Sequence, residues 1–183
     1  QEKNLQYEDY LAFQQLLPGI QACTPCAEKK ELAKYQGNQL LVEIQGVSAD
    51  FFRIEPRGIK TGSSFSAYHD QAGVPVAVLG SEVVKELFKQ ENPVGKTILI
   101  GSHPFKVIGV FNEAPQRMNR IQNPNVNIVV PFSSVWRRMI NPGENNSIHH
   151  IIVRPKEDKN STQLVSSMRR LLRFRHQIGE GEG

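Results

Sequence analysis

The chain has 183 residues, of which 39% are hydrophobic, so it is long enough to bury the core of one large domain or two small ones. Its 22 Lys and Arg residues exceed its 18 Asp and Glu residues, which gives a net charge of +4. No apolar run approaches the roughly 18 to 20 residues that cross a bilayer, so we predict no membrane span within this sequence. The polar start at Gln1 does not read as a signal peptide, and we expect any export signal to lie outside it.

The first half of the chain alternates between helical and strand-like patterns. Apolar residues at helical spacing predict a helix over residues 7–17 that stops at Pro18 and Gly19. Residues 27–32 are good helix formers and predict a second helix. Alternating and apolar runs predict strands at residues 40–45 and 75–79, and the breaker-rich residues 55–73 predict a loop.

The second half continues the alternation. Ser81 is expected to cap a helix that buries an apolar stripe ending at Phe88. Apolar residues from Leu164 to Leu172 predict a last helix, which Asn160 or Ser161 would cap and Gly179 would end. Four strands are predicted between these helices, the first two as a hairpin, at residues 97–100, 105–111, 125–132 and 148–153.

Residues 95–97 read Gly-Lys-Thr, like the end of a phosphate-binding loop. Such a loop needs a glycine five residues before this tripeptide, and that position holds Gln90. A strand pattern also follows Lys96, where a nucleotide loop would open a helix. We therefore predict a turn that leads into the hairpin, and we expect no cofactor.

Cys23 and Cys26 form a Cys-X-X-Cys motif in front of a predicted helix. This pattern is typical of thioredoxin-type sites, where a helix N-terminus lowers the pKa of the first thiol. Against it, no Trp precedes Cys23, and the predicted helix breaks at Gln36 and Gly37. A disulfide between the two cysteines and a pair of free thiols are the alternatives. A periplasmic thiol-disulfide oxidoreductase that uses Cys23 and Cys26 is the second candidate function.

Other polar clusters give weaker signals for catalysis or metal binding. His69 and Asp70 lie near three serines but lack the signature of a nucleophile elbow, so we predict a solvated loop. His149 and His150 are neighbours in a predicted strand and would point to opposite faces. We expect no metal site and no catalytic residue.

Five basic residues concentrate positive charge near the end of the chain: Arg169, Arg170, Arg173, Arg175 and His176. A run of this kind suits a nucleic acid or anionic headgroups. It also complements the negative C-terminal end of a helix, which is the interpretation we favour. No aromatic residues interleave with a second basic surface, so we expect no nucleic-acid partner.

Several motifs occur together in a fixed order. They are GVSADFFRI at residues 46–54, NPVGKTI at residues 92–98, FKVIGV at residues 105–110, VVPFSS at residues 129–134 and LLRFRHQIG at residues 171–179. This series resembles the periplasmic core domain of MacB-type (MacB/FtsX-like) ABC transporter permeases. The resemblance covers roughly residues 42–179, and the first forty residues match weakly.

The resemblance implies an α/β (α+β) fold. Residues 1–55 and 148–183 would form a discontinuous porter-like α/β subdomain, and residues 56–147 an inserted, mostly β second subdomain. The domain would be extracytoplasmic, in the periplasm, between two helices of a bacterial inner-membrane protein. Its implied partners are a cytoplasmic ATPase domain or subunit, a second permease in a homodimer, and a periplasmic adaptor (membrane fusion) protein or exported substrate. It would transmit ATP-driven motion without being an enzyme.

Residues 113–122 lie between two predicted strands and lack a regular apolar period. Long loops in compact domains are often functional. Arg117 and Arg120 can donate hydrogen bonds to a partner, while Met118 and Ile121 offer adaptable apolar contact. We predict that this segment binds a partner, against the alternative of a loop without one.

Overall fold

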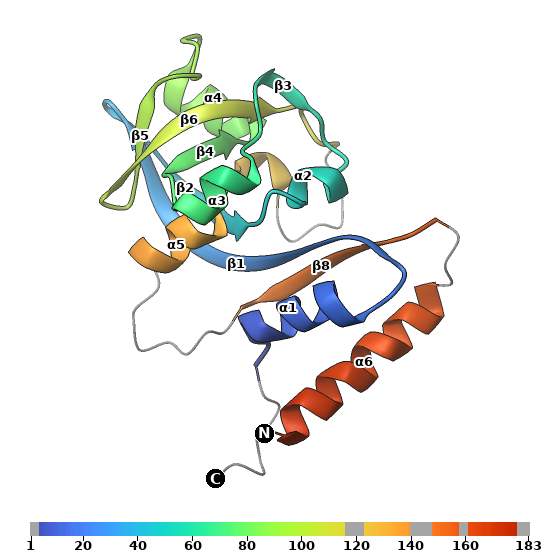
Figure 1. Cartoon of the computed structure of the whole chain (residues 1–183). Helices are drawn as coiled ribbons and strands as arrows, with labels where there is room; N and C mark the ends of the chain where they lie inside the picture. Colours follow the sequence, from blue (N-terminus) through green and yellow to red (C-terminus); the bar gives the residue numbers. More distant parts are fainter. Residues whose placement is uncertain (1–3, 116–122, 140–147, 158–160, 179–183) are drawn as a thin grey trace.

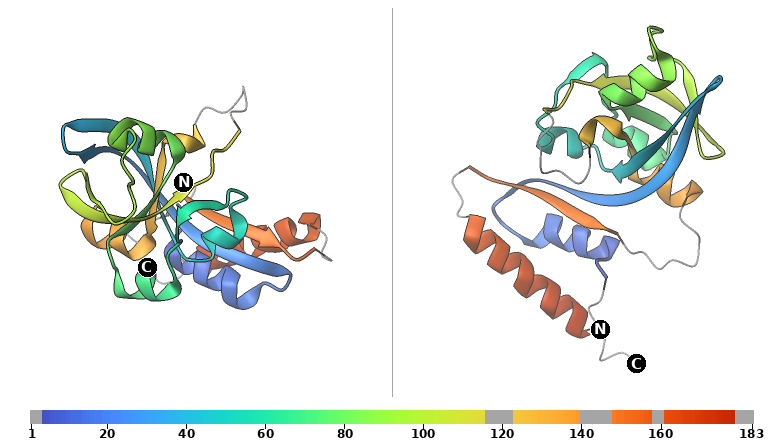
Figure 2. Two further views of the ribbon diagram at one scale, coloured as in Figure 1. Left: turned by 90° about the horizontal axis from the view of Figure 1, so that it is seen from above. Right: turned by 180° about the vertical axis from the view of Figure 1, so that it is seen from behind.

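The computed structural model describes residues 4–115, 123–139, 148–157 and 161–178. Figure 1 shows an upper part in which strands curl into a barrel, and a lower part built on two strands and two helices. In the lower part, α1 (Tyr7–Leu16) and α6 (Ser161–Ile178) pack against β1 (Ile20–Tyr35) and β8 (His150–Pro155). The two further views in Figure 2 place both helices on the same side of these strands. The predicted α/β fold class is confirmed.

The other described elements lie in the upper part. They are, in chain order, β2 (Asn38–Val47), α2 (Phe51–Ile54), β3 (Ile59–Gly62), α3 (Ala67–Ala72), β4 (Val76–Leu79), α4 (Ser81–Phe88), β5 (Thr97–Ile100), β6 (His103–Phe111), the 3-10 helix η1 (Pro124–Val126), β7 (Asn127–Pro131) and α5 (Phe132–Arg138).

Six strands close into a ring in the order β1, β2, β7, β4, β6, β5 and back to β1. The pair between Ala33 of β1 and Ile100 of β5 closes it. The β2–β7 and β4–β6 pairs are parallel and the other ring pairs are antiparallel. β3 pairs with β6 beside the ring. Ring closure pairs strand edges that an open sheet would leave exposed.

Strand β1 belongs to both parts of the molecule. Residues 20–26 pair with β8 in the lower part, and residues 26–35 pair with β2 in the barrel. Its 16 residues, at about 3.3 Å each, give a strand of roughly 50 Å. One hydrogen-bonded strand therefore connects the two parts.

Buried side chains form three clusters. The barrel interior holds the first, which includes Ile44, Leu79, Leu87, Ile98 and Phe105. The second surrounds Phe51, Phe65 and Phe111. The third fills the space between α1, α6, β1, β8 and α5 and includes Tyr10, Phe13, Cys23, Phe132 and Ile148. Each fully buried Leu, Ile or Phe side chain contributes about 1.5–3 kcal/mol to stability.

Most predicted elements lie where the sequence pattern placed them. The helix at residues 7–17, the strands at 40–45 and 75–79, and the hairpin at 97–111 are confirmed as α1, β2, β4 and β5–β6. The strands predicted at 125–132 and 148–153 correspond to β7 and β8, with shifted ends. The last helix is confirmed as α6, but its predicted end residues Asn160 and Gly179 lie outside the described residues.

Three predictions of secondary structure are wrong. Residues 27–32 form part of β1, because continuous pairing with β2 from Cys26 to Tyr35 outweighs their helix propensity. Residues 55–73 contain β3 and α3, so they are not a plain loop. Gly80 occupies the N-cap of α4, and the Ser81 hydroxyl, one position later, has no hydrogen-bond partner.

The division into two subdomains stays a prediction. β2, within residues 1–55, pairs in parallel with β7, within residues 56–147, so the two predicted units share one sheet. Within the described ranges, none of the helices combines the length and the apolar character needed to cross a membrane.

Gly109 provides a test of how closely Ser63, just after β3, approaches β6. A Cβ at this position would lie 2.3 Å from the backbone carbonyl oxygen of Ser63, which cannot rotate away. We expect Gly109→Ala to lower the free energy of unfolding in urea by about 1–3 kcal/mol. Gly37→Ala is the control, because a Cβ there meets nothing within 4 Å. Equal stability of the two variants would contradict this close approach.

Candidate partner-binding segment and its polar base

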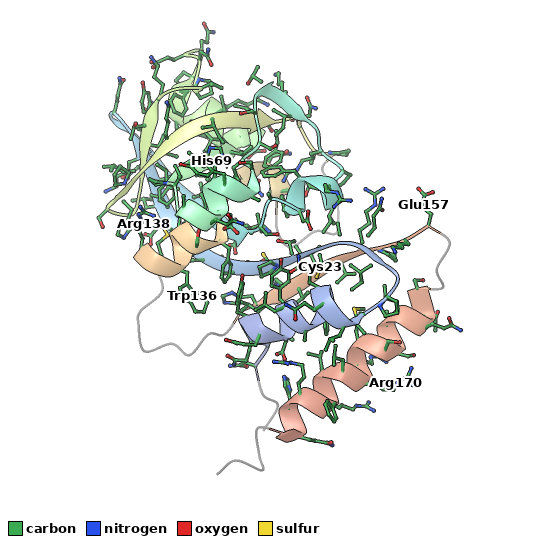
Figure 3. The ribbon with its side chains drawn as sticks, viewed as in Figure 1. Cys23, His69, Trp136, Arg138, Glu157 and Arg170 are labelled. Atoms are coloured by element: carbon green, nitrogen blue, oxygen red, sulfur yellow. The ribbon has the colours of Figure 1, made fainter. Side chains whose placement is uncertain are left out.

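Cys23 and Cys26 are two free, buried thiols in the middle of β1. Residues three apart on a strand point to opposite faces, and the two side chains belong to different clusters, with Cys23 against α1 (Figure 3). Burial raises the pKa of each thiol to about 12, with a smaller contribution from Asp50 for Cys23 and from Glu28 and Glu43 for Cys26.

This geometry bears on both redox interpretations of the motif. Of the two alternatives left open, a disulfide and a pair of free thiols, the structure has the free thiols, which lie on opposite sides of the strand. A thioredoxin-type site does not fit the geometry, because a strand occupies the place of the helix that would lower a thiol pKa. Protonated, buried thiols do not act as nucleophiles at neutral pH.

His69 and Asp70 do not act on a common partner. His69 Nδ1 accepts a hydrogen bond from the Ser66 backbone N–H at 3.1 Å, which caps α3. Asp70 Oδ1 accepts one from the Ser133 backbone N–H at 3.3 Å, which joins α3 to α5. Burial raises the pKa of Asp70, although hydrogen bonds from Ser133 and Phe132 offset part of this effect. Both residues fix helix ends, so the geometry gives no catalytic triad.

His149 and His150 both contact Glu28. The Glu28 backbone N–H donates to His149 Nδ1 at 2.9 Å, and His150 Nε2 lies 3.3 Å from Glu28 Oε2. Across the described part of the chain, no group of three or more His, Cys, Asp or Glu side chains is placed to hold a metal ion.

The Gly-Lys-Thr tripeptide forms the predicted turn into the hairpin. Gly95 has a φ of +91°, and its N–H donates to the Val107 carbonyl oxygen at 2.8 Å. Thr97 then starts β5. The backbone N–H of Gly95 is therefore used within the fold.

The basic run divides into two groups. Arg175 Nε donates to Asp9 Oδ1 at 2.8 Å, and His176 Nε2 lies 3.2 Å from Asp9 Oδ2. Asp9, in the first turn of α1, is only 1% exposed. These contacts tie the last turn of α6 to the first turn of α1, so two of the five basic residues serve a carboxylate as well as the helix end that we predicted.

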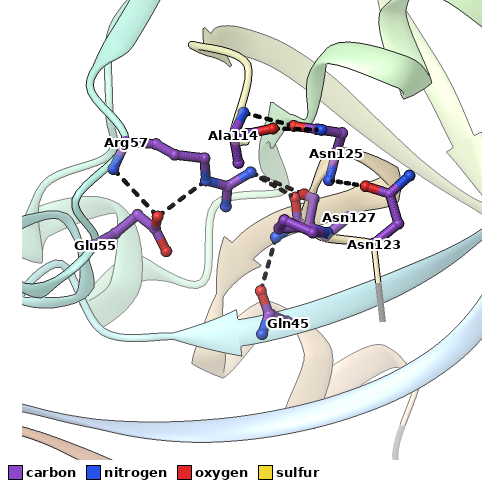
Figure 4. A network of polar contacts seen from close by, with 8 residues as sticks. Gln45, Glu55, Arg57, Ala114, Asn123, Asn125 and Asn127 are labelled. Atoms are coloured by element: carbon purple, nitrogen blue, oxygen red, sulfur yellow. Dashed lines mark hydrogen bonds and ion pairs between the residues drawn. The ribbon is translucent and has the colours of Figure 1, made fainter. Parts of the chain in front are cut away.

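The four residues predicted to bind a partner, Arg117, Met118, Arg120 and Ile121, lie outside the described residues. The described residues on either side of residues 116–122 form a polar base, which Figure 4 shows. At its centre, the Ala114 N–H donates to Asn125 Oδ1 at 2.8 Å, and Asn125 Nδ2 donates to the Ala114 carbonyl oxygen at 3.0 Å. These paired hydrogen bonds hold the two chain stretches together.

Arg57 joins the polar base to the barrel (Figure 4). Its guanidinium is buried and lies 3.0 Å from Glu55, and it donates to the Pro124 carbonyl oxygen at 2.8 Å and to Asn127 Oδ1 at 3.2 Å. It also stacks 4.1 Å from the centre of the Phe111 ring. Asn127 Nδ2 in turn donates to Gln45 Oε1 on β2 at 2.8 Å.

Sequence analysis did not identify this network. Arg57 lies in a segment predicted as a loop, where a single arginine does not indicate which residues it contacts. Asn123, Asn125 and Asn127 alternate with other residues just before and within β7, and this spacing was the available signal. These hydrogen bonds hold together the described chain stretches on either side of residues 116–122.

The chain matches the family described as the MacB-like periplasmic core domain over residues 1–171. The chain belongs to this family. The match includes the first forty residues, which resemble the family only weakly by motif. It confirms the resemblance, and this chain is the periplasmic domain of a MacB-like ABC transporter permease.

Relatives and solved structures agree with this assignment. The macrolide export ATP-binding/permease protein MacB of Salmonella paratyphi A is 32% identical over 174 residues, which are 94% of this chain and 26% of that protein. The chain thus spans about a quarter of the length of the curated relatives it matches.

Two solved structures share the fold. The periplasmic region of MacB from Actinobacillus actinomycetemcomitans is 25% identical, with a TM-score of 0.81, over 96% of this chain and 76% of that one. The extracellular domain of the noncanonic ABC-type transporter YknZ from Gram-positive bacteria is 19% identical, with a TM-score of 0.78, over 95% of this chain and 85% of that one.

The Asp9 cluster gives a prediction on pH. Burial by itself would raise the pKa of Asp9, but hydrogen bonds from Arg175, the Gln6 backbone and His176, with the charge of His176, hold it below its ordinary value. A carboxyl with a lowered folded-state pKa stabilises the fold above its unfolded pKa of about 4 and loses that contribution as pH falls through the folded value.

We therefore expect Asp9→Asn to lower the free energy of unfolding by about 2 kcal/mol at pH 7. The difference from the wild type should shrink below about pH 4, as measured by urea denaturation across a pH series. Glu86→Gln, on the exposed face of α4, is the matched control and should change little. A difference for Asp9→Asn that is constant down to low pH would contradict the ionised cluster.

The polar base gives a second prediction. Asn125→Ala leaves the buried N–H and carbonyl of Ala114 without partners, so we expect a loss of about 2 kcal/mol or more in the free energy of unfolding. Asn92→Ala removes an exposed side chain that accepts one backbone hydrogen bond, and it should cost much less. Similar losses for the two variants would show that the base does not hold the chain stretches together.

Proposed function

We propose that this domain transmits ATP-driven motion from the membrane part of a MacB-like permease to a periplasmic adaptor protein or an exported molecule. The ATPase would be a cytoplasmic domain or subunit, the permease would work as a homodimer, and the domain itself would have no catalytic step. The relatives named macrolide export ATP-binding/permease protein support this proposal, because their names join ATP binding, permease and export in one protein.

The single observation that carries the proposal is the continuity of β1. Its first half pairs with β8 beside α1 and α6, and its second half pairs with β2 and β5 in the barrel. Displacement of the lower part therefore moves the barrel through a strand held by hydrogen bonds along its length. A flexible linker between the parts would dissipate the same movement.

Aromatic contacts connect the two parts of the molecule in addition to β1. Tyr7 of α1 stacks on Phe132 of α5, with ring centres 5.2 Å apart, and Phe132 lies 5.3 Å from Trp136. The Ser133 backbone N–H of α5 also donates a hydrogen bond to Asp70 of α3. The first helix of the chain thus contacts α5 directly, which adds a second route for movement between the parts.

The partner contact is proposed at residues 113–122, where Arg117, Met118, Arg120 and Ile121 offer hydrogen bonds and adaptable apolar contact. The polar base supports this choice, because a buried arginine and three asparagines hold the described chain stretches on either side of residues 116–122 through hydrogen bonds.

The test replaces Arg117, Met118 and Arg120 together by alanine. We expect the melting temperature of this domain to stay nearly unchanged, since these residues lack an apolar period that would place them in the core. Export of a macrolide by the full-length permease should fall several-fold while its ATP hydrolysis continues.

Lys34→Ala with Lys60→Ala serves as the control, because both side chains are exposed, Lys34 on β1 of the ring and Lys60 on β3 beside it. This control should export like the wild type. Normal export by the triple variant would remove residues 113–122 from the proposed contact, and a large drop in its melting temperature would place them in the core.

A further inference from the structure

Helix α6 carries five basic residues and no acidic residue among its 18. Exposed helices normally mix both signs, since opposite charges three or four residues apart stabilise each other. No such pair can form within α6. An oppositely charged neighbour for these residues can therefore come only from another part of the chain or from a partner.

The structure compensates only part of this charge within the described chain. Arg175 and His176 turn inward to Asp9. Arg169, Arg170 and Arg173 are exposed, and no ion pair is described for them. Figure 3 shows Arg170 on the side of α6 that faces away from α1. Only Arg175 and His176 lie in the last turn of α6, where the charge of a helix end acts, so the helix-end interpretation of the basic run does not account for these three arginines.

An exposed aromatic residue lies next to these arginines in the sequence. Phe174 is 61% exposed, follows Arg173 directly and lies one helical turn after Arg170. The apolar face of α6 is already occupied, because Leu164, Met168, Leu171 and Leu172 pack toward the third core cluster or are buried. Phe174 is therefore not part of that face, and its ring has no described ring contact.

We infer that the outer face of α6, formed by Arg169, Arg170, Arg173 and Phe174, docks on the anionic headgroups of a lipid bilayer. Clustered basic residues attract anionic lipid, and an aromatic ring among them can enter the boundary between headgroups and acyl chains. A domain of a permease stays tethered near a bilayer, so even a weak contact is favoured by a high effective concentration.

The location on α6 adds to the inference. The end of α6 is fixed to the start of α1 by Asp9, so this face moves with the lower part of the molecule. Contact with headgroups would set the tilt of that part relative to the membrane. This role is separate from residues 113–122, and vesicle binding tests it without any measurement of export.

The experiment measures binding of the 183-residue chain to vesicles of phosphatidylcholine with and without phosphatidylglycerol, by flotation at low and raised salt. Use of the full chain includes Glu180 and Glu182, which follow α6 in the sequence. We expect binding only to the vesicles with phosphatidylglycerol, weakening as salt rises. Arg169→Ala with Arg170→Ala and Arg173→Ala should weaken it at least tenfold, and Phe174→Ser should weaken it several-fold.

The matched control is Lys34→Ala with Lys60→Ala and Lys106→Ala, which also removes three exposed positive charges, but from the barrel. It should bind like the wild type. Equal weakening by the two triple variants would show that net charge alone drives binding and would overturn the inference. Absence of binding to phosphatidylglycerol vesicles would also overturn it and would leave an acidic protein surface as the partner of α6.

Discussion

Strand β1 has to fit two packing environments at once, because its first half lies over α1 and α6 while its second half closes the barrel. Where the two meet, residues 22–27 are buried one after another instead of alternating. Both faces of the strand are covered there, so only small side chains fit. The sequence Ala-Cys-Thr-Pro-Cys-Ala meets that requirement. The two cysteines are explained as small apolar residues of this junction rather than as a redox pair.

The buried polar groups are concentrated where distant pieces of chain must stay together. Thr24 Oγ1 accepts hydrogen bonds from the backbone N–H and the hydroxyl of Ser48, each at 2.9 Å, and so joins β1 to the segment after β2. Asp9 joins the first and last helices. Buried polar networks specify one arrangement because an unpaired member is costly. A domain that passes movement from one part to another depends on such fixed joints.

Some basic residues of this molecule pair with carboxylates inside the fold, and others remain on the surface. Arg57, Arg175 and His176 turn toward carboxylates within the fold, and these contacts position the polar base and the helix ends. The three outward arginines of α6 leave a one-signed surface instead. Within α6, basic residues close in sequence therefore serve either the fold or the surface, depending on which side of the helix they occupy.

The sequence by itself determined the elements that have a clear apolar period. It also determined membership of the family of MacB-like periplasmic core domains. The helix at residues 7–17, the alternating strand of Val42 and Ile44 and the hairpin after Gly95 depend on local spacing, which any fold must respect. Only the tertiary structure decided the state of residues 27–32, since their helix propensity is small beside a full ladder of pairs with β2. It also decided the partners of Arg57 and Asp9, which lie 67 and 166 residues away, at Pro124 and Arg175. Single charged residues have no period, so their partners emerge only when the fold brings remote segments into contact.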